Sequence, residues 1–251
     1  YGSRGANGVI IITTKKGKTG QARLNFNTSV GLSQLNESKI NLMNGREFAT
    51  YRNLYAEAMG WDQIYVDTTI EGKFFPNPSK IGEGTHWLDA VKRNGAAQNY
   101  SLDFSGGREV VYSGSIGWLS QEAPLIGSQF KRANFRLNLQ TNLNPWLSLD
   151  NTTTYSQTTA DNSPADTRDA SKYGLFEAVL FANPAEPIYN PDGTLNYVGM
   201  TTLNIPAIQF SPISLGTDVL NRNSIQTFLD NLSLKAKIIP GFSAEVRGSV
   251  F

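Results

Sequence analysis

The chain has 251 residues, and its 22 lysines and arginines nearly balance its 21 aspartates and glutamates, which leaves a formal net charge of +1. This balance excludes a global electrostatic attraction to nucleic acid. The chain contains no cysteine, which excludes disulfides, thiolate metal sites and a cysteine nucleophile. No stretch approaches the roughly 18 apolar residues of a membrane helix, whereas the strands of a membrane barrel need only about 10 alternating residues each.

The first eighteen residues combine a glycine-rich turn with a short apolar run. Gly2, Gly5 and Gly8 permit backbone angles with positive φ, and Asn7-Gly8 is a strong turn dipeptide. The run from Val9 to Ile12 is β-branched and apolar on both faces, which favours a strand covered on both sides. On these residues alone, an ordinary hairpin in an α/β or all-β core explains the segment equally well.

Seven later segments alternate between apolar and polar residues, which is the pattern of a strand with two different faces. In the first of them, Leu24 and Phe26 share one face and Asn25 and Asn27 share the other. We therefore expect an all-β sheet, with strands near residues 21–33, 98–105, 110–119, 130–143, 147–158, 222–239 and 242–251.

Two long segments, 34–97 and 159–221, interrupt this series and carry the helical patterns. Asn44 to Met59 has apolar residues at helical spacing, with Asn44 as the expected cap and Gly60 as the expected stop. Shorter helices are predicted at Thr85 to Arg93 and at Ser171 to Ala182.

The connections between the strands run long, short, medium, short, long, short. The short ones are predicted at Gly106-Gly107, Asn144-Pro145 and Pro240-Gly241. Bacterial outer-membrane barrels have short turns at one rim and long loops at the other, and this order fits that architecture.

The charged residues of the strands fall on the parity opposite the apolar residues. An arginine or lysine on the lipid face near mid-bilayer costs roughly 2–4 kcal/mol, so a membrane barrel would enforce this pattern. A soluble antiparallel sheet with one wet face shows the same alternation, and that alternative stays open. If the sheet is a barrel wall, the residues that face its lumen are Arg23, Asp103, Arg136, Asp150, Lys235, Glu245 and Arg247.

Asp230 breaks the pattern because it lies in phase with Phe228 and Leu232. A bulge near Asn231 that resets the register would explain it. A position near the outer interface, where an acid costs about 0–1 kcal/mol, would also explain it.

No catalytic, cofactor or metal constellation emerges, so we expect neither a cofactor nor an enzyme. His86 is the only histidine, and it stands beside Trp87 in a polar segment. Asp161, Asp166 and Asp169 lie close together but lack the regular spacing of a calcium loop.

The string YGSRGANGVIIITTKKGK, residues 1–18, resembles the end of the plug domain in SusC/RagA-type TonB-linked outer-membrane transporters. Further similar stretches are HWLDAV at residues 86–91, QNYSL at 98–102, YSGSIGWLSQ at 112–121 and ANPAEPIY at 182–189. One departure is Thr85-His86, where many relatives would show Thr-Asp.

The resemblance implies an internal fragment, with residues 1–18 ending the plug domain and residues 19–251 beginning a plugged barrel of about 22 strands. It implies that the plug-to-barrel hinge motif comprises Tyr1, Gly2, Arg4, Gly5, Asn7 and Gly8. The long segments would be extracellular loops carrying short helices. Their aromatic residues would meet the substrate or a partner, or would pack within the loops, which explains them at least as well. The candidates are Trp61, Tyr65, Trp87, Tyr189 and Tyr197.

The function that the resemblance implies is TonB-dependent active import of a glycan or peptide across the outer membrane of a Gram-negative, Bacteroidota-type bacterium. The implied partners are a SusD-like surface lipoprotein that forms a lid and the TonB complex, which would contact a region ahead of residue 1. An outer-membrane or secreted β-protein that acts as an adhesin without transporting is the alternative, and an enzyme on a β-scaffold is the least favoured reading.

Overall fold

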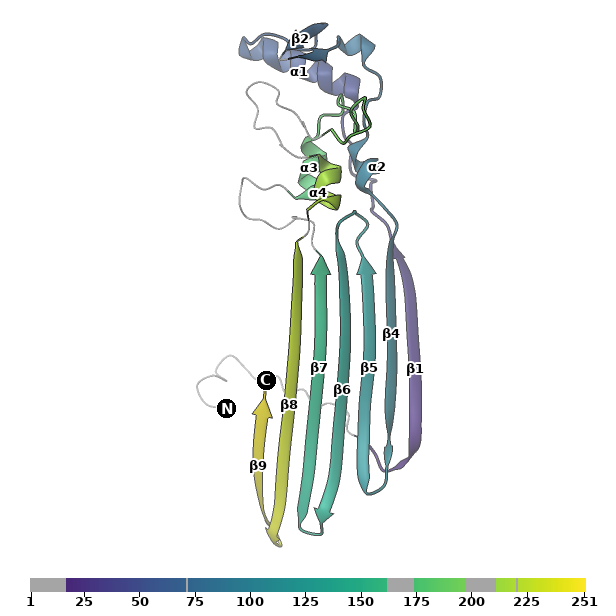
Figure 1. The fold of residues 1–251 in the computed structure, drawn as a ribbon, viewed down its shortest axis with the longest axis vertical. Helices are drawn as coiled ribbons and strands as arrows, with labels where there is room; N and C mark the ends of the chain where they lie inside the picture. The colour runs from purple at the N-terminus through teal and green to yellow at the C-terminus, as the bar shows by residue number, and fades with distance from the viewer. Residues whose placement is uncertain (1–16, 71, 162–173, 197–210, 220) are drawn as a thin grey trace.

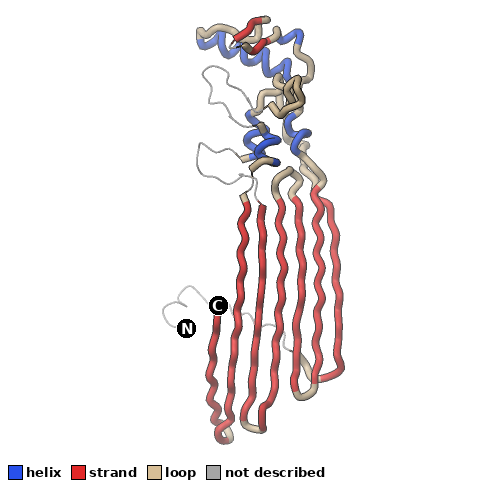
Figure 2. The backbone as a smooth tube through the Cα atoms, viewed as in Figure 1, coloured by secondary structure: helices blue, strands red, loops and turns tan. Residues whose placement is uncertain are grey.

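The computed structural model describes residues 17–70, 72–161, 174–196, 211–219 and 221–251. Seven long strands in these residues form one antiparallel sheet in which each strand pairs with the next one along the chain (Figures 1 and 2). The strands are β1 (Gly20–Ser33), β4 (Gly95–Gly107), β5 (Val110–Glu122), β6 (Gln129–Asn144), β7 (Leu147–Asp161), β8 (Arg222–Ile239) and β9 (Phe242–Val250).

All seven predicted strands are present, and several are longer than the alternation indicated. β4 extends through Gly106 and Gly107, because these residues still pair with Tyr112 and Val111. The short turn therefore lies at residues 108–109, and the prediction of a turn at Gly106-Gly107 is wrong. The next turn lies at residues 145–146, where the Asn144 Oδ1 accepts hydrogen bonds from two following backbone N–H groups.

The connections segregate by length to the two ends of the sheet. The two long connections and the segment 123–128 leave the end drawn at the top of Figure 1, while the two-residue turns lie at the bottom. We call these the long-connection end and the short-turn end. The predicted order of connection lengths is confirmed, and no long connection leaves the short-turn end within the described residues.

The first long connection contains α1 (Gly45–Met59), whose ends follow the predicted capping chemistry. The Asn44 Oδ1 accepts from the Glu47 N–H at 2.9 Å, and the Glu47 carboxylate accepts from the Asn44 N–H at 3.0 Å. Gly60 ends the helix at φ 70°, a left-handed conformation that glycine adopts without strain.

The other helices are short. α2 (Trp87–Val91) is shorter than the predicted Thr85 to Arg93, because His86 provides no side-chain cap hydrogen bond and Lys92 is already extended. α3 (Leu175–Phe181) falls inside the predicted Ser171 to Ala182, whose first residues lie outside the described ranges. No helix in the described part of the chain has the length and apolar character needed to cross a membrane.

Four short elements were not predicted from the sequence. They are β2 (Thr68–Ile70) and β3 (Lys73–Phe75), which pair as a small hairpin, the 3₁₀ turn η2 (Pro78–Lys80) and α4 (Pro212–Thr217). Each is too short to show a periodic pattern, so only its packing against the rest of the connection fixes it.

The pairing register gives the sheet one apolar and one polar face. A rung is a set of cross-strand partners, and partners in antiparallel strands share a face. One rung of the apolar face crosses six strands and consists of Phe26, Leu102, Ile116, Phe135, Tyr155 and Phe228. No second sheet covers this face in the described residues, and Phe26 remains 63% exposed.

The buried core lies in the long connections rather than against the sheet. One cluster joins α2, α3 and α4, and consists of Trp87, Leu88, Val91, Leu175, Ala178, Val179, Ala182 and Leu215. A second joins α1 to β3 and η2, and consists of Ala49, Ile64, Tyr65, Phe75 and Ile81. The two connections therefore fold into a compact cap above the long-connection end (Figure 1).

The β7–β8 ladder decides between the two explanations of Asp230. Pairing runs without interruption from Leu147 and Ala236 to Asp161 and Arg222, so the predicted bulge near Asn231 is wrong. Asp230 lies on the apolar face. The next rung toward the long-connection end is the Tyr155–Phe228 pair, and beyond this pair the residues of β8 on the same face are polar. Its carboxylate accepts hydrogen bonds from Thr153 and Asn151 at 2.6 and 3.0 Å.

Candidate functional site in the long connections

The segment Asn183–Glu186 of the second long connection lies at the centre of the cap. Its carbonyl oxygens accept hydrogen bonds from the first connection: Asn183 O from Trp87 Nε1 at 2.9 Å, and Pro184 O from Thr85 N at 2.7 Å. Glu186 O accepts from the Thr85 hydroxyl at 2.6 Å, and the Glu186 carboxylate pairs with Lys73 at 2.6 Å. These contacts join two loops that are about a hundred residues apart in sequence.

Tyr65 and Trp87 are structural residues of this cap, and their prediction as loop aromatics open to a ligand is wrong. They are 1% and 6% exposed. The Tyr65 hydroxyl accepts from Asn183 Nδ2 at 2.9 Å, while its backbone N–H donates to Asn53 at 3.0 Å. Burial raises the pKa of the Tyr65 hydroxyl to about 12, so this side chain stays neutral.

An aromatic row formed by Tyr51, Tyr55 and Trp61 occupies the exposed side of α1. The Tyr51 and Tyr55 ring centroids lie 6.2 Å apart, and Trp61 meets Tyr55 edge-on at 5.9 Å. Trp61 is 40% exposed. The helix instead buries its small-residue side at Gly45, Ala49, Arg52 and Ala56.

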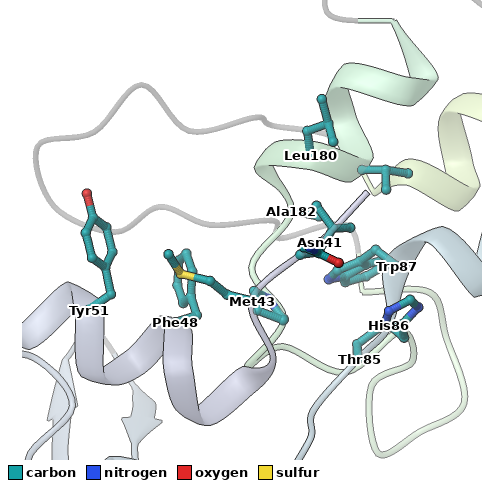
Figure 3. A pocket seen from close by; sticks show the side chains of 12 residues that line it. Asn41, Met43, Phe48, Tyr51, Thr85, His86, Trp87, Leu180 and Ala182 are labelled. Carbon is teal, nitrogen blue, oxygen red and sulfur yellow. The ribbon is translucent and has the colours of Figure 1, made fainter. Parts of the chain in front are cut away.

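A hollow of about 310 Å³ opens between α1 and α3 beside this row (Figure 3). Apolar side chains from three segments form most of its wall: Met43, Phe48, Tyr51, Leu180 and Ala182. Asn41 and His86 add polar groups to its lining (Figure 3). The arrangement suits an apolar group with one polar edge and contains no pair of groups arranged for acid–base catalysis.

Below the hollow, His86 belongs to a small ionic group at α2. Its Nδ1 lies 2.9 Å from Asp89, which also forms an ion pair with Lys92. The Lys92 hydrogen bond, aided by His86, holds the pKa of the Asp89 carboxyl below its usual value. His86 is therefore a helix-start residue whose Nδ1 lies beside the Asp89 carboxylate.

The remaining loop candidates and the hinge motif divide between open and undescribed positions. Tyr189 is 55% exposed in a turn where it bridges to Leu195. Tyr197 and the hinge motif residues Tyr1, Gly2, Arg4, Gly5, Asn7 and Gly8 lie outside the described residues.

The seven residues predicted to face a lumen all lie on the polar face of the sheet. Asp103 and Arg136 share one rung through Ser115, and Lys235 pairs directly with Glu245. Asp150 pairs with Ser233, which in turn pairs with Arg247. Arg23 pairs with Ser105, two positions along the same strand face from Asp103.

The segment that precedes β1 approaches this polar face at the short-turn end. A Cβ atom placed on Gly17 would lie 2.8 Å from Val111 Cγ1 and 2.8 Å from the Tyr112 carbonyl oxygen. Val111 shares the polar face with Asp150, because both pair with Gln140. Glycine is therefore required where the chain crosses onto β5.

The described residues contain no group of three or more His, Asp or Glu side chains that could hold a metal ion. Asp161, considered above for a calcium loop, instead forms two hydrogen bonds with Arg222, at 2.6 and 2.8 Å. Asp166 and Asp169 lie outside the described residues.

Sequence reasoning missed Asn183 and the α1–α3 hollow. The only local signal for Asn183 was its place in a proline-rich stretch, which gives no indication that its amide would be buried. The hollow combines residues from both long connections, so no continuous motif marks it.

No family model matches the chain. Among curated proteins, TonB-dependent receptor P3 of Formosa agariphila is 30% identical over an alignment of 261 positions that covers 98% of this chain and 23% of that protein. TonB-dependent receptor SusC of Bacteroides thetaiotaomicron is 32% identical over 142 residues, covering 55% of this chain and 12% of SusC. The chain spans about a quarter or less of the length of these relatives.

The structure of the RagAB peptide transporter matches with a TM-score of 0.70 at 22% identity, covering 99% of this chain and 30% of that one. The RagAB peptide importer in its closed-closed state matches with a TM-score of 0.68. The sheet is thus a section of an antiparallel β-barrel wall of the kind found in TonB-dependent receptors. The chain is similar to TonB-dependent receptors over nearly its whole length, and to SusC over about half of it.

Proposed function

We propose that this chain is part of a transporter that imports a glycan or peptide nutrient across the outer membrane, using energy delivered by TonB. The observation that carries the proposal is the two-faced sheet, with an uncovered apolar face, a charged face and all long connections at one end. An apolar face of this kind is stable against hydrocarbon, and a charged face is stable against a water-filled lumen.

The approach of Gly17 to the polar face supports a plug on that side of the wall. The chain ahead of β1 comes in over Val111 at the short-turn end, where a barrel has its inner rim. Residues 1–18 would then end the plug and residues 19–251 would begin the barrel. The hinge motif would be the point at which the plug pivots when the inner membrane supplies energy.

The cap would face the outside and meet the nutrient and a SusD-like lipoprotein lid. The aromatic row Tyr51, Tyr55 and Trp61 and the adjacent α1–α3 hollow are open apolar features of the cap. Half-exposed aromatic rings that keep polar edges bind sugar rings or peptide side chains through the same stacking contacts. Both substrate classes therefore remain within the proposal.

Deletion of the parent gene tests import directly. We expect the deletion strain to lose growth on one glycan or on peptides as the sole nutrient, and to regain it with the wild-type gene. A complementing gene without its plug-encoding region should fail to restore energy-dependent uptake. Normal uptake by the deletion strain on every nutrient tested would contradict the proposal.

The adhesin alternative is favoured only by the exposed aromatic row, since an adhesin needs a binding surface on its cap and no plug. It predicts that cells lacking the protein keep their uptake but lose surface binding of a glycan. The relatives named above are receptors and importers, and none is named as an enzyme.

A further inference from the structure

A second hollow, of about 300 Å³, lies on the apolar face near the long-connection end. All of its lining residues belong to β5, β6, β7 and β8. They are Trp118, Gln129, Lys131, Ala133, Gln157, Thr159, Asp161 and Arg222. Import through the lumen gives these residues no role, because the lumen lies on the other face of the sheet.

The hollow lies where the apolar face turns polar. Trp118, Ala133 and Gln157 share the rung directly above the aromatic rung that contains Tyr155. The next rung carries Lys131 and Thr159, and the last carries Gln129, Asp161 and Arg222. Successive rungs on one face are about 7 Å apart along the strand, so the change from hydrocarbon-like to charged surface is abrupt.

Two cations and one carboxylate line this hollow. Asp161 is 6% exposed and accepts from Arg222 twice, which orients the guanidinium and leaves its Nη1 outside the pair. Lys131 is exposed, and its positive charge acts on the Asp161 carboxylate in the same hollow. Glu122 lies across the rung from Gln129, but it lines a neighbouring hollow instead.

We propose that this hollow binds the phosphate-bearing headgroup of an outer-leaflet lipid. Lys131 and the free edge of Arg222 face the phosphate, Gln157 and Thr159 offer hydrogen bonds to the headgroup, and Trp118 packs at the start of the acyl chains. The inference rests on the proposed function, because it requires the apolar face to contact lipid. A free phosphate ion is the poorer fit, since the floor formed by Trp118 and Ala133 is apolar and continues into the aromatic rung.

The test uses the full-length protein in detergent and native mass spectrometry. The probes are diphosphorylated lipid A, the same lipid with both phosphates removed, and inorganic phosphate alone. We expect the phosphorylated lipid to bind in preference. Lys131→Gln should weaken this binding about fivefold, whereas Lys131→Arg should retain it.

Arg132→Gln is the matched control, because Arg132 is the next residue along β6 and faces the polar side. Equal binding of both lipids would overturn the proposal. So would equal weakening by Lys131→Gln and Arg132→Gln, or full competition by inorganic phosphate.

A separate readout distinguishes this proposal from the membrane placement on which it rests. The chain contains no cysteine, so Ala133→Cys and Asn134→Cys each add one thiol to it for a spin label. The label at residue 133 should be accessible to oxygen dissolved in lipid, and the label at residue 134 to a water-soluble relaxant. If both labels behave as expected but Lys131→Gln does not change lipid A binding, only the proposed headgroup site is contradicted. If residue 133 is in water, the membrane placement fails and the headgroup site with it.

Discussion

At the scale of single residues, Asn183 shows how one side chain can hold two loops together. Its Nδ2 donates to the Tyr65 hydroxyl, its Oδ1 accepts from Ala185 N at 2.9 Å, and its carbonyl oxygen accepts from Trp87. The hydrogen bonds with Tyr65 and Trp87 are buried, so water cannot replace Asn183 as their partner. Unsatisfied buried polar groups cost about 1–3 kcal/mol each.

Asn183→Ala should therefore destabilise the cap by about 1–3 kcal/mol, because the Tyr65 hydroxyl would lose its donor inside the core. Hydrogen exchange of the amides in 45–65 and 174–196 measures this loss in the full-length protein. Asn190→Ala is the control, since the Asn190 amide bonds only within its own exposed turn. Equal exchange in the two variants would contradict the role assigned to Asn183.

The raised pKa of Tyr65 predicts how the stability of the cap changes at alkaline pH. An unfolded tyrosine titrates near 10, and the folded pKa is about 12. Because the folded value is the higher one, its stabilisation is complete below about pH 10 and is lost as pH rises toward 12, by about 3 kcal/mol at most. Near-ultraviolet circular dichroism should show the cap melting in this window. Tyr65→Phe should remove that part of the pH dependence while lysine titration remains.

The candidate site shows what single residues reveal in sequence. Trp61 was identified as an open aromatic and is one, because nothing in its neighbourhood supplies a core to cover it. Tyr65 and Trp87 are also aromatic and, like Trp61, have polar neighbours in sequence, yet both are buried. Their covering partner, the Asn183–Glu186 segment, comes from the other long connection, and no local pattern announces a contact over that distance.

At the scale of elements, the ends of α1 were predictable from the sequence and its buried face was not. The capping box at Asn44 and Glu47 and the left-handed Gly60 are local chemistry, so their positions follow from the sequence. The apolar residues at helical spacing predicted the helix but not its buried side, and the structure buries the side with Gly45 and Ala49. Small residues there allow Ile81, Gly84 and Pro184 to approach the helix closely.

Gly84 tests this close approach. A Cβ on Gly84 would lie 2.1 Å from the Pro184 carbonyl oxygen, and its φ of +73° is unfavourable for other residues. Gly84→Ala should destabilise the cap by at least about 1 kcal/mol. Gly82→Ala is the matched control, since nothing lies within 4 Å of its Cβ position. Limited proteolysis of the long connections compares the two, and similar cleavage rates would count against the packing described.

At the scale of the whole molecule, the sheet leaves one apolar face uncovered. Its apolar face has no second layer in the described residues, and its hydrophobic clusters lie in the cap. A sheet with one uncovered apolar face and one charged face is suited to a boundary between hydrocarbon and water. The cap lies at one end of the sheet only, so the two ends of the sheet differ.

Ile116→Arg and Ser115→Arg compare the two faces at neighbouring positions of β5. Ile116 belongs to the apolar rung, while Ser115 lies between Asp103 and Arg136 on the polar face. In lipid, Ile116→Arg should cost roughly 2–4 kcal/mol and Ser115→Arg much less. Unfolding of the full-length protein from lipid vesicles by denaturant measures the difference. Equal costs would show that the apolar face does not contact hydrocarbon.

The sequence by itself determined the strands, their two faces, the order of long and short connections and the helix caps. These features depend on residues that are neighbours in the chain or repeat at a fixed period, so local chemistry specifies them. Only the tertiary structure decided that Asp230 stays in register on the apolar face, that Tyr65 and Trp87 are buried, and which side of α1 is open. Each of these depends on contacts between distant segments, and those contacts form only when the β7–β8 ladder and the two long connections come together.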